Sequence, residues 1–224
     1  MTSILKNCSR IVALLIFGIG SALSAHADTV VLTEGFDGVA GGNYFAGTTV
    51  NQFTVQSGAV EVLASNNDFG RCVAAGGSPI CINLDGALPG STFTGTTFVS
   101  TAFFGPGTYD LFFDLAGSQR GQSNTTSLFF GNVLNSEITL AGNAAFSTYS
   151  FLNVVIGPGE LSRIVFFQPG SDNMGNLLDN VRLVQRDDVA PVPEPATMLL
   201  LGTGLAGVGA ALRRKRIAKQ GVSG

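Results

Sequence analysis

The chain has 224 residues, with 12 Lys and Arg against 15 Asp and Glu and a formal net charge of −3. All fifteen acidic residues lie between Asp28 and Glu194, a segment with only five basic residues, all arginines. Because such an acidic surface repels phosphates, we set nucleic-acid binding aside. The single histidine, His26, precedes this segment, which therefore lacks the imidazole of a Ser-His-Asp triad or a histidine metal site.

Residues 1–27 have the three parts of a secretory signal peptide. Lys6 and Arg10 supply positive charge, an apolar core follows, and Ala25–Ala27 form a small-x-small cleavage site. We therefore expect the Sec translocon and signal peptidase as partners, and a mature chain that begins at Asp28. An uncleaved N-terminal anchor is the alternative, which the short apolar core and the good cleavage site disfavour.

Export makes the cysteines interpretable, because disulfides persist outside the cytoplasm. Cys8 lies in the signal peptide, so Cys72 and Cys81 are the pair that remains. We expect them to form a disulfide that closes a short loop and stabilises the fold by about 2–3 kcal/mol. A metal site is the alternative, but two cysteines without a nearby histidine are too few ligands.

The segment between the signal peptide and the C-terminal end has an all-β pattern. Short apolar runs alternate with turn residues, and in residues 108–115 apolar side chains alternate with Asp110 and Asp114. Ser57-Gly58 is expected to join residues 51–56 and 59–63 as a hairpin. Further strands are expected at 80–84, 96–103, 125–130, 137–140, 146–156, 161–167 and 177–184. Nine or ten strands predict one domain, residues 28–185, folded as a two-sheet antiparallel sandwich of jelly-roll type.

Four adjacent phenylalanine pairs lie in or beside the expected strands. Because neighbouring residues in a strand face opposite sides, the two rings of each pair are expected to point apart. The sequence leaves open whether the outer rings are buried as well or form an exposed apolar patch for self-association. The pairs are Phe103-Phe104, Phe112-Phe113, Phe129-Phe130 and Phe166-Phe167.

After a linker at residues 186–192, the C-terminal end has three segments in a fixed order. Pro193-Glu194-Pro195 is stiff and non-helical. Residues 196–212 carry no charge and as a helix would rise about 25 Å, enough to reach across the hydrocarbon layer of a bilayer. Arg213, Arg214, Lys215 and Arg216 would then stay on the cytoplasmic side, followed by a cytoplasmic tail at residues 217–224.

This order of segments, residues 193–216, resembles a PEP-CTERM domain, the signal that exosortase processes in many Gram-negative bacteria that make extracellular polysaccharide. The resemblance implies that exosortase, an intramembrane cysteine protease/transpeptidase, recognises Pro193, Glu194 and Pro195 and cuts near them. The protein would then cross the inner membrane, stay anchored until it is processed, and reach the cell surface or the extracellular space. A simple tail anchor behind a proline-rich linker is the alternative.

Several phrases in the middle of the chain are similar to those of PEP-CTERM ectodomains whose sandwich is related in pattern to galactose-binding-like carbohydrate-binding modules. The resemblance implies a structural Ca²⁺ held by Glu34, Asp37 and Asp179, since calcium prefers hard oxygen ligands. In the alternative, Glu34 is solvated and Asp179-Asn180 is a polar pair at a strand edge. The phrases are Glu34-Gly35-Phe36-Asp37, Asn83–Gly86, Gly107–Leu111, Asp114–Gly121 and Asn176–Val181.

Sugar-binding modules usually stack an aromatic ring on the sugar, and this chain has no tryptophan. Tyr44, Tyr109 and Tyr149 are the tyrosines that would take its place. Arg120 would contact an anionic polymer through its planar fork, or pair with a nearby aspartate on the acidic surface.

These observations favour a non-enzymatic exported protein with a structural or adhesive role in a polysaccharide matrix or biofilm. A carbohydrate-binding module is the first alternative. A two-carboxylate glycoside hydrolase is the second, with Asp68, Asp85 and Asp172 as its candidates. All three lie in Gly- and Asn-rich turns, where aspartate more often forms the turn itself.

Overall fold

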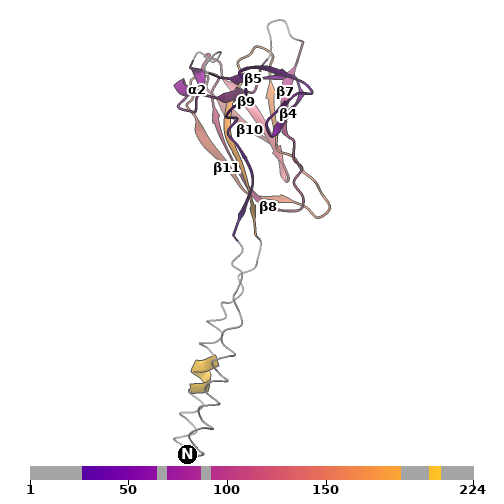
Figure 1. The fold of residues 1–224 in the computed structure, drawn as a ribbon, viewed down its shortest axis with the longest axis vertical. Coiled ribbons are helices and arrows are strands. Elements are labelled where there is room, and N and C mark those ends of the chain that lie inside the picture. Colours follow the sequence, from indigo (N-terminus) through magenta and orange to yellow (C-terminus); the bar gives the residue numbers. More distant parts are fainter. Residues whose placement is uncertain (1–26, 65–69, 87–91, 188–201, 208–224) are drawn as a thin grey trace, which may run out of the picture. The chain divides into compact units, whose positions relative to one another are not determined.

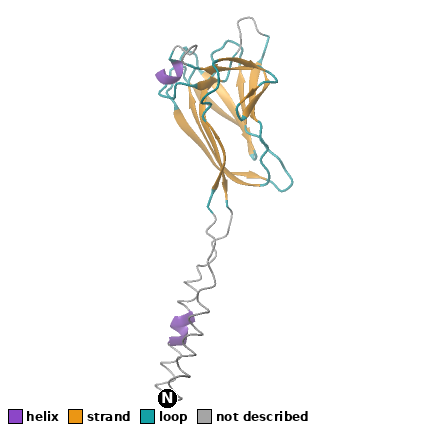
Figure 2. Cartoon of the chain, in the orientation of Figure 1, coloured by secondary structure: helices purple, strands orange, loops and turns teal. Residues whose placement is uncertain are grey.

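The computed structural model describes residues 27–64, 70–86, 92–187 and 202–207. The chain divides into two units, and residues 27–188 form a β-sandwich (Figures 1 and 2). The predictions for the signal peptide, most of the linker and most of the sorting tail fall outside the described residues. Within the expected membrane segment, residues 202–207 are described and are helical. Among the described residues, none of the helices has the length and apolar character needed to span a bilayer.

Two antiparallel sheets make up the sandwich, which confirms the predicted fold class. Sheet A has seven strands, and β1 (Thr29–Glu34) lies beside β13 in it. The other six strands of sheet A follow the order β11 (Ser147–Ile156), β8 (Gly107–Ala116), β13 (Leu177–Arg186), β6 (Cys81–Asn83), β5 (Ala59–Leu63) and β2 (Gly42–Phe45). Sheet B has the order β10 (Val133–Leu140), β9 (Asn124–Phe130), β12 (Val165–Pro169), β7 (Gly95–Ser100), β4 (Phe53–Ser57) and β3 (Thr49–Val50).

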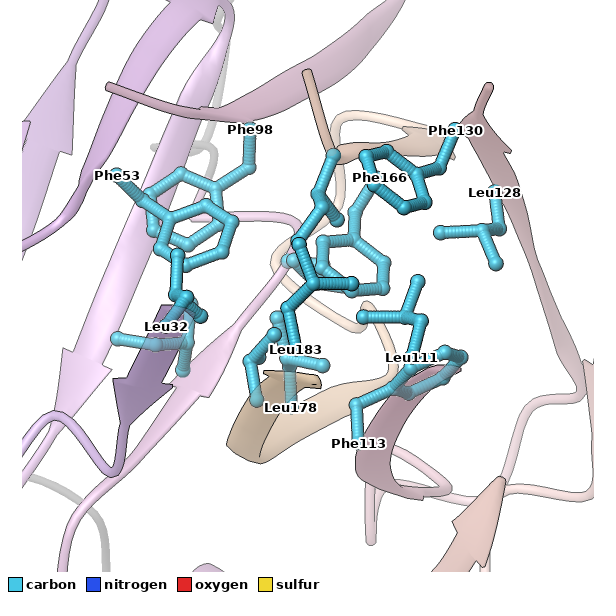
Figure 3. Packing of buried hydrophobic residues seen from close by; sticks show 14 of the residues in the cluster. Leu32, Phe53, Phe98, Leu111, Phe113, Leu128, Phe130, Phe166, Leu178 and Leu183 are labelled. Carbon is cyan, nitrogen blue, oxygen red and sulfur yellow. The ribbon is translucent and has the colours of Figure 1, made fainter. Parts of the chain in front are cut away.

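The inward-facing side chains of both sheets form one aromatic-rich core (Figure 3). Phe53 and Phe98 of sheet B stack with ring centroids 5.0 Å apart. Phe113 of sheet A meets Phe166 of sheet B edge-on, also at 5.0 Å. Edge-on and offset contacts of this kind add to the free energy gained by burying the rings. The alternating pattern of β8 is thereby confirmed, because Tyr109, Leu111, Phe113 and Leu115 face this core and the residues between them do not.

Each of the four phenylalanine pairs places one ring in the core and the other outside it. Phe104, Phe113, Phe130 and Phe166 belong to the core. Of their neighbours, Phe103 is exposed, whereas Phe112, Phe129 and Phe167 are half-buried on the outer faces of the sheets. The outer rings of the strand pairs are therefore not buried in the core. Phe112 lies on the outer face of sheet A, and Phe129 and Phe167 lie on the outer face of sheet B.

The predicted hairpin around Ser57-Gly58 is wrong. β4 pairs with β7 in sheet B, whereas β5 pairs with β6 and β2 in sheet A. Gly58 carries the chain from one sheet to the other at a φ of 71°. A Cβ at Gly58 would lie 2.6 Å from the carbonyl oxygen of Gly95, so both the backbone angle and the close contact require glycine.

A second, smaller core lies against one end of sheet A. Helix α2 (Arg71–Ala74) carries Cys72, whose disulfide to Cys81 of β6 is formed as predicted. Ala75 and the half-buried Phe146 complete this layer together with residues of β5, β8 and β13. The backbone N–H of Phe146 donates to the carbonyl of Ala75 at 2.8 Å, which ties the loop before β11 to the end of α2.

Candidate functional site

The outer face of sheet B carries aromatic rings among hydroxyl-bearing side chains. Phe167 of β12 lies opposite Ser127 of β9 on one side and opposite Thr97 of β7 on the other. Because directly paired residues project from the same face, these three side chains form a row across the sheet. In the next row, Val165 of β12 lies opposite Phe129 of β9. We call these five residues the aromatic face.

Phe129 and Phe167 are diagonal neighbours on adjacent strands, so their side chains start about 7 Å apart. Both are half-buried and keep part of each ring exposed. A Cβ at Gly95 would lie 2.9 Å from Cε2 and Cζ of Phe167, so the Phe167 ring lies over the glycine backbone. The local sequence thus builds the site: β12 supplies the aromatic residue Phe167, and Gly95 of β7, which lies opposite Pro169, leaves room for its ring.

Hydroxyl pairs flank the two rings. Thr125 Oγ1 and Thr139 Oγ1 are 2.7 Å apart, and Ser57 Oγ donates to Thr97 Oγ1 at 2.9 Å. The row through Phe167 ends on β10 at the exposed carboxylate of Glu137, which lies opposite Ser127. Flat apolar rings beside hydroxyl donors and acceptors suit a neutral ligand that has both apolar faces and hydroxyl groups.

The predicted stacking residues lie elsewhere. Tyr149 of β11 packs against Phe113 with ring centroids 5.8 Å apart and planes 15° from parallel, so it covers an open edge of the core. The Tyr44 hydroxyl donates to the carbonyl of Ala40 at 2.9 Å, and its ring also packs on the core. Tyr109 is buried, which raises the pKa of its phenol. The adjacent phenylalanine pairs were the sequence signal that leads to Phe129 and Phe167.

Arg120 lies in the loop between β8 and β9 and is not one of the residues of the aromatic face. Its Nη1 donates to the backbone carbonyl of Asn173 at 3.1 Å, and its backbone N–H donates to Ser118 Oγ. Arg120 is exposed. Its partner in the structure is therefore a carbonyl of a neighbouring loop, where the sequence suggested an aspartate or an anionic polymer.

Glu34, the first of the three predicted calcium ligands, joins the two sheets. Its Oε1 accepts the backbone N–H of Phe36 at 2.6 Å and Nδ2 of Asn51 at 3.1 Å. Its Oε2 accepts the backbone N–H of Gln52 at 3.2 Å. The buried carboxylate thus connects the end of β1 in sheet A to the β3–β4 turn of sheet B.

Asp179, the third predicted ligand, is buried at a different place. Its carboxylate accepts hydrogen bonds from Ser78 Oγ and from the backbone N–H of Asn180. Burial raises the pKa of Asp179 to about 6 despite these hydrogen bonds, and the negative charges of Asp114 and Asp37 raise it further.

The structure therefore brings Asp37 and Asp179 into one neighbourhood but not Glu34. Among the described residues, there is no group of three or more histidine, cysteine, aspartate or glutamate side chains placed to hold a metal ion. Glu34 and Asp179 accept their hydrogen bonds at separate places, and calcium binding by Glu34, Asp37 and Asp179 stays a prediction.

The carboxylates considered for hydrolysis form turns. Asp85 is buried, and its Oδ2 accepts the backbone N–H of Asp172 at 3.0 Å. Asp172 Oδ1 in turn accepts the backbone N–H of Met174. The third candidate, Asp68, lies outside the described residues. Asp85 and Asp172 thus fit the turn-forming alternative stated above.

Comparison with solved structures finds β-sandwich domains of low sequence identity. The CBM22-1 xylan-binding domain of Paenibacillus barcinonensis Xyn10C is 10% identical, with a TM-score of 0.45 over 74% of this chain and 100% of that one. The K1 cleaved adhesin domain of Lys-gingipain from Porphyromonas gingivalis is 16% identical, with a TM-score of 0.44 over 69% of this chain and 97% of that one. Likeness at this level says nothing about a ligand.

Comparison with curated proteins finds no match. Comparison with family models finds one at the C-terminal end, where residues 191–215 match the PEP-CTERM protein-sorting motif. The match includes Pro193-Glu194-Pro195, the apolar segment and the first three residues of the basic cluster. The predicted sorting signal is thereby confirmed, and it marks the chain as an exported protein with a C-terminal sorting motif.

Proposed function

We propose that the protein is an exosortase substrate that is released at the cell surface or into the extracellular matrix, where its β-sandwich has a non-catalytic, structural or adhesive role in a polysaccharide matrix or biofilm. The observation that supports this function is the PEP-CTERM motif at residues 191–215. The delivered part would be the sandwich, residues 28–185, which has its own two-sheet core.

The experiment is the intact mass and location of the protein in its native host and in a strain without exosortase. We expect a species that begins at Asp28 and ends near Pro193–Pro195 outside the inner membrane, and a C-terminally uncut species in the mutant strain. In the host, Glu194→Ala should prevent removal of the C-terminal tail, whereas Pro191→Ala, three residues earlier and outside Pro193-Glu194-Pro195, is the matched control and should be processed. An uncut C-terminus in both strains would mean that the C-terminal segment is only a tail anchor, and it would contradict the proposed processing by exosortase.

A second function, binding of a neutral polysaccharide, is supported by the aromatic face. Its two half-buried rings are diagonal neighbours between hydroxyl groups, and the one charged residue in the described part of the two rows is Glu137, at the end of the Phe167 row. A polysaccharide chain offers apolar sugar faces to such rings and hydroxyl groups to threonine and serine. The same face would then attach the released domain to the matrix.

A further inference from the structure

Three loops, the start of β1 and the end of β13 meet at one end of the sandwich, which we call the tether end. β13 ends there with Arg186 opposite Thr108, and β1 begins there with Thr29 opposite Gln185 (Figure 1). The loops are residues 101–106, 131–132 and 157–164. They are hydrogen-bonded to one another, because Gly131 N donates to Ser162 Oγ and Phe104 pairs with Ser162. The three loops therefore lie side by side at Phe104, Gly131 and Ser162.

Exposed apolar side chains gather at this end. Leu134 is 80% exposed, Leu161 69% and Phe103 62%, and they lie on or next to the three loops. Toward the same end, the outer side of sheet A adds four more, from the start of β1 and the second half of β11. These are Val30, Val31, Leu152 and Val155. In the described part of the sandwich, Phe45, Val73 and Phe93 are the exposed large apolar residues outside this group. So concentrated a patch needs an explanation.

The short length of chain between the sandwich and the apolar part of the sorting motif indicates that this patch comes near a membrane surface. From Arg186 the chain reaches Ala196, where the apolar part of the sorting motif begins, in ten residue steps. Ten extended residues span at most about 36 Å. The other end of the ten-residue strand β8 lies about 30 Å further away. Once the apolar segment is in a bilayer, the tether end is the end that is held near it.

The charges at this end favour insertion over electrostatic attraction. Arg186 pairs with Asp110 at 3.3 Å, so Asp28, Glu160 and Asp187 are left with Arg163, and the described part of this end has no excess of positive charge to attract anionic lipid. The guanidinium of Arg163 lies 4.9 Å from the centroid of the Phe103 ring. An apolar ring with a cation beside it suits the boundary between headgroups and acyl chains, where the ring is buried and the cation stays hydrated.

We propose that Phe103, Leu134 and Leu161 dip into the lipid surface while the sorting segment is still attached, so that the sandwich stands on the membrane through its tether end. The contact orients the domain and its linker before cleavage. This inference rests on the proposed function, because it needs the C-terminal segment to be in the membrane. Detachment after cleavage follows, since three shallow side chains without a covalent anchor bind only weakly.

The test uses residues 28–224, the expected product of signal peptidase, reconstituted in phosphatidylcholine vesicles that carry a nitroxide at a shallow or a deep position. An NBD label is placed at Leu161→Cys, with Phe93→Cys at the opposite end as the matched control and Leu205→Cys as a probe of the tail. We expect the Leu161 label to shift to the blue and to lose fluorescence most with the shallow nitroxide. The Phe93 label should lose none. Replacing part of the lipid with anionic phosphatidylglycerol should leave the Leu161 result unchanged.

Quenching at Leu205 without quenching at Leu161 would overturn the inference and leave the proposed function standing. A Leu205 label that is not quenched would show that the tail stays outside the bilayer, which overturns both. Equal quenching at Leu161 and Phe93, or a blue shift at Leu161 without quenching by lipid, would mean general adsorption or contact with a second copy. Either result also overturns the inference.

Discussion

Glu34 and Asp179 project from opposite faces of sheet A, although they are only two positions apart in the register of β1 and β13. Glu34 lies opposite Val181, which faces the core. Asp179 lies opposite Asp114, which is between two core residues of β8 and therefore faces outward. Asn180, with a φ of 50°, inserts a bulge between them, and the bulge reverses the alternation of side chains along β13. The two carboxylates consequently have separate tasks.

The first prediction concerns Glu34 as a link between the sheets. Glu34→Ala removes three hydrogen bonds and leaves the backbone N–H groups of Phe36 and Gln52 without their acceptor. We expect the free energy of unfolding to fall by about 3 kcal/mol, as for the loss of hydrogen bonds to a buried charge. Urea denaturation measures it. Glu137→Ala, at an exposed position of β10, is the control and should change stability by less than about 0.5 kcal/mol.

The second prediction concerns pH. The pKa of Asp179 is about 6 in the folded protein, above the usual value of 3.8, so the folded state holds this proton more tightly than the unfolded state. Stability from this group is therefore full below pH 4, falls between pH 4 and 6, and stays low above pH 6. One pKa unit corresponds to about 1.4 kcal/mol, so the loss is at most about 3 kcal/mol. Asp179→Asn should gain stability relative to the parent at pH 7.5 but not at pH 4; an equal effect at both pH values contradicts this.

Calcium offers a direct check of the same carboxylate. An ion between Asp37 and Asp179 would lower the pKa of Asp179 and raise the melting temperature, and Asp179→Ala would abolish that response. Glu34→Gln should leave any calcium response unchanged, because its carboxylate faces the core side of the sheet. Melting curves recorded in Ca²⁺ and in a chelator test for this site. If the melting temperature of the parent protein is the same in both, the calcium hypothesis is wrong.

Much of the fold could be predicted because local patterns carry it. The alternation in β8 identifies its two faces, and two cysteines left after export predict the disulfide. The step from β4 to β5 could not be predicted in the same way. A strand, a Gly turn and a second strand look alike whether the second strand folds back or crosses to the other sheet. Packing between the sheets decides this, and the short β2 and β3 are likewise defined by their partners.

The candidate site was harder to predict than the fold. The pairs Phe129-Phe130 and Phe166-Phe167 indicate outward rings, but only the register of β9 and β12 shows that Phe129 and Phe167 are neighbours. Tyrosine is the more usual choice for an exposed platform because its hydroxyl tolerates water. Here Tyr149 stacks on Phe113 at the edge of the core. Which ring is exposed depends on strand order, and strand order is a property of the whole domain.

The third prediction concerns the disulfide. Both sulfur atoms are buried in the small core with Phe146, so replacing Cys72 and Cys81 by alanine loosens α2 as well as the loop that the bond closes. We expect a loss of about 2–3 kcal/mol. We also expect faster hydrogen exchange at the Phe146 amide, whose acceptor is the carbonyl of Ala75. Val73→Ala, on the exposed side of the same helix, is the control and should leave both unchanged.

The fourth prediction concerns the aromatic face. Phe129→Ala and Phe167→Ala should each weaken binding to the host's own extracellular polysaccharide at least about tenfold, which corresponds to 1.4 kcal/mol. Gly95→Ala should weaken it too and also lower stability, because the new methyl group would lie 2.9 Å from the Phe167 ring and 2.9 Å from the backbone carbonyl oxygen of Gln168. Affinity electrophoresis through gels that contain the polysaccharide measures all three variants under one condition.

Phe112→Ala is the matched control for these variants. Phe112 is also a half-buried ring on an outer face, but it lies on sheet A beneath the guanidinium of Arg182, 4.4 Å from its centroid. We expect Phe112→Ala to retain binding, and Tyr149→Ala to lose stability rather than affinity because its ring covers the core edge. If Phe112→Ala weakens binding as much as Phe167→Ala does, the effect is general destabilisation and the aromatic face is not the site. Binding that survives in the Phe129/Phe167 double variant would place the polysaccharide on another surface.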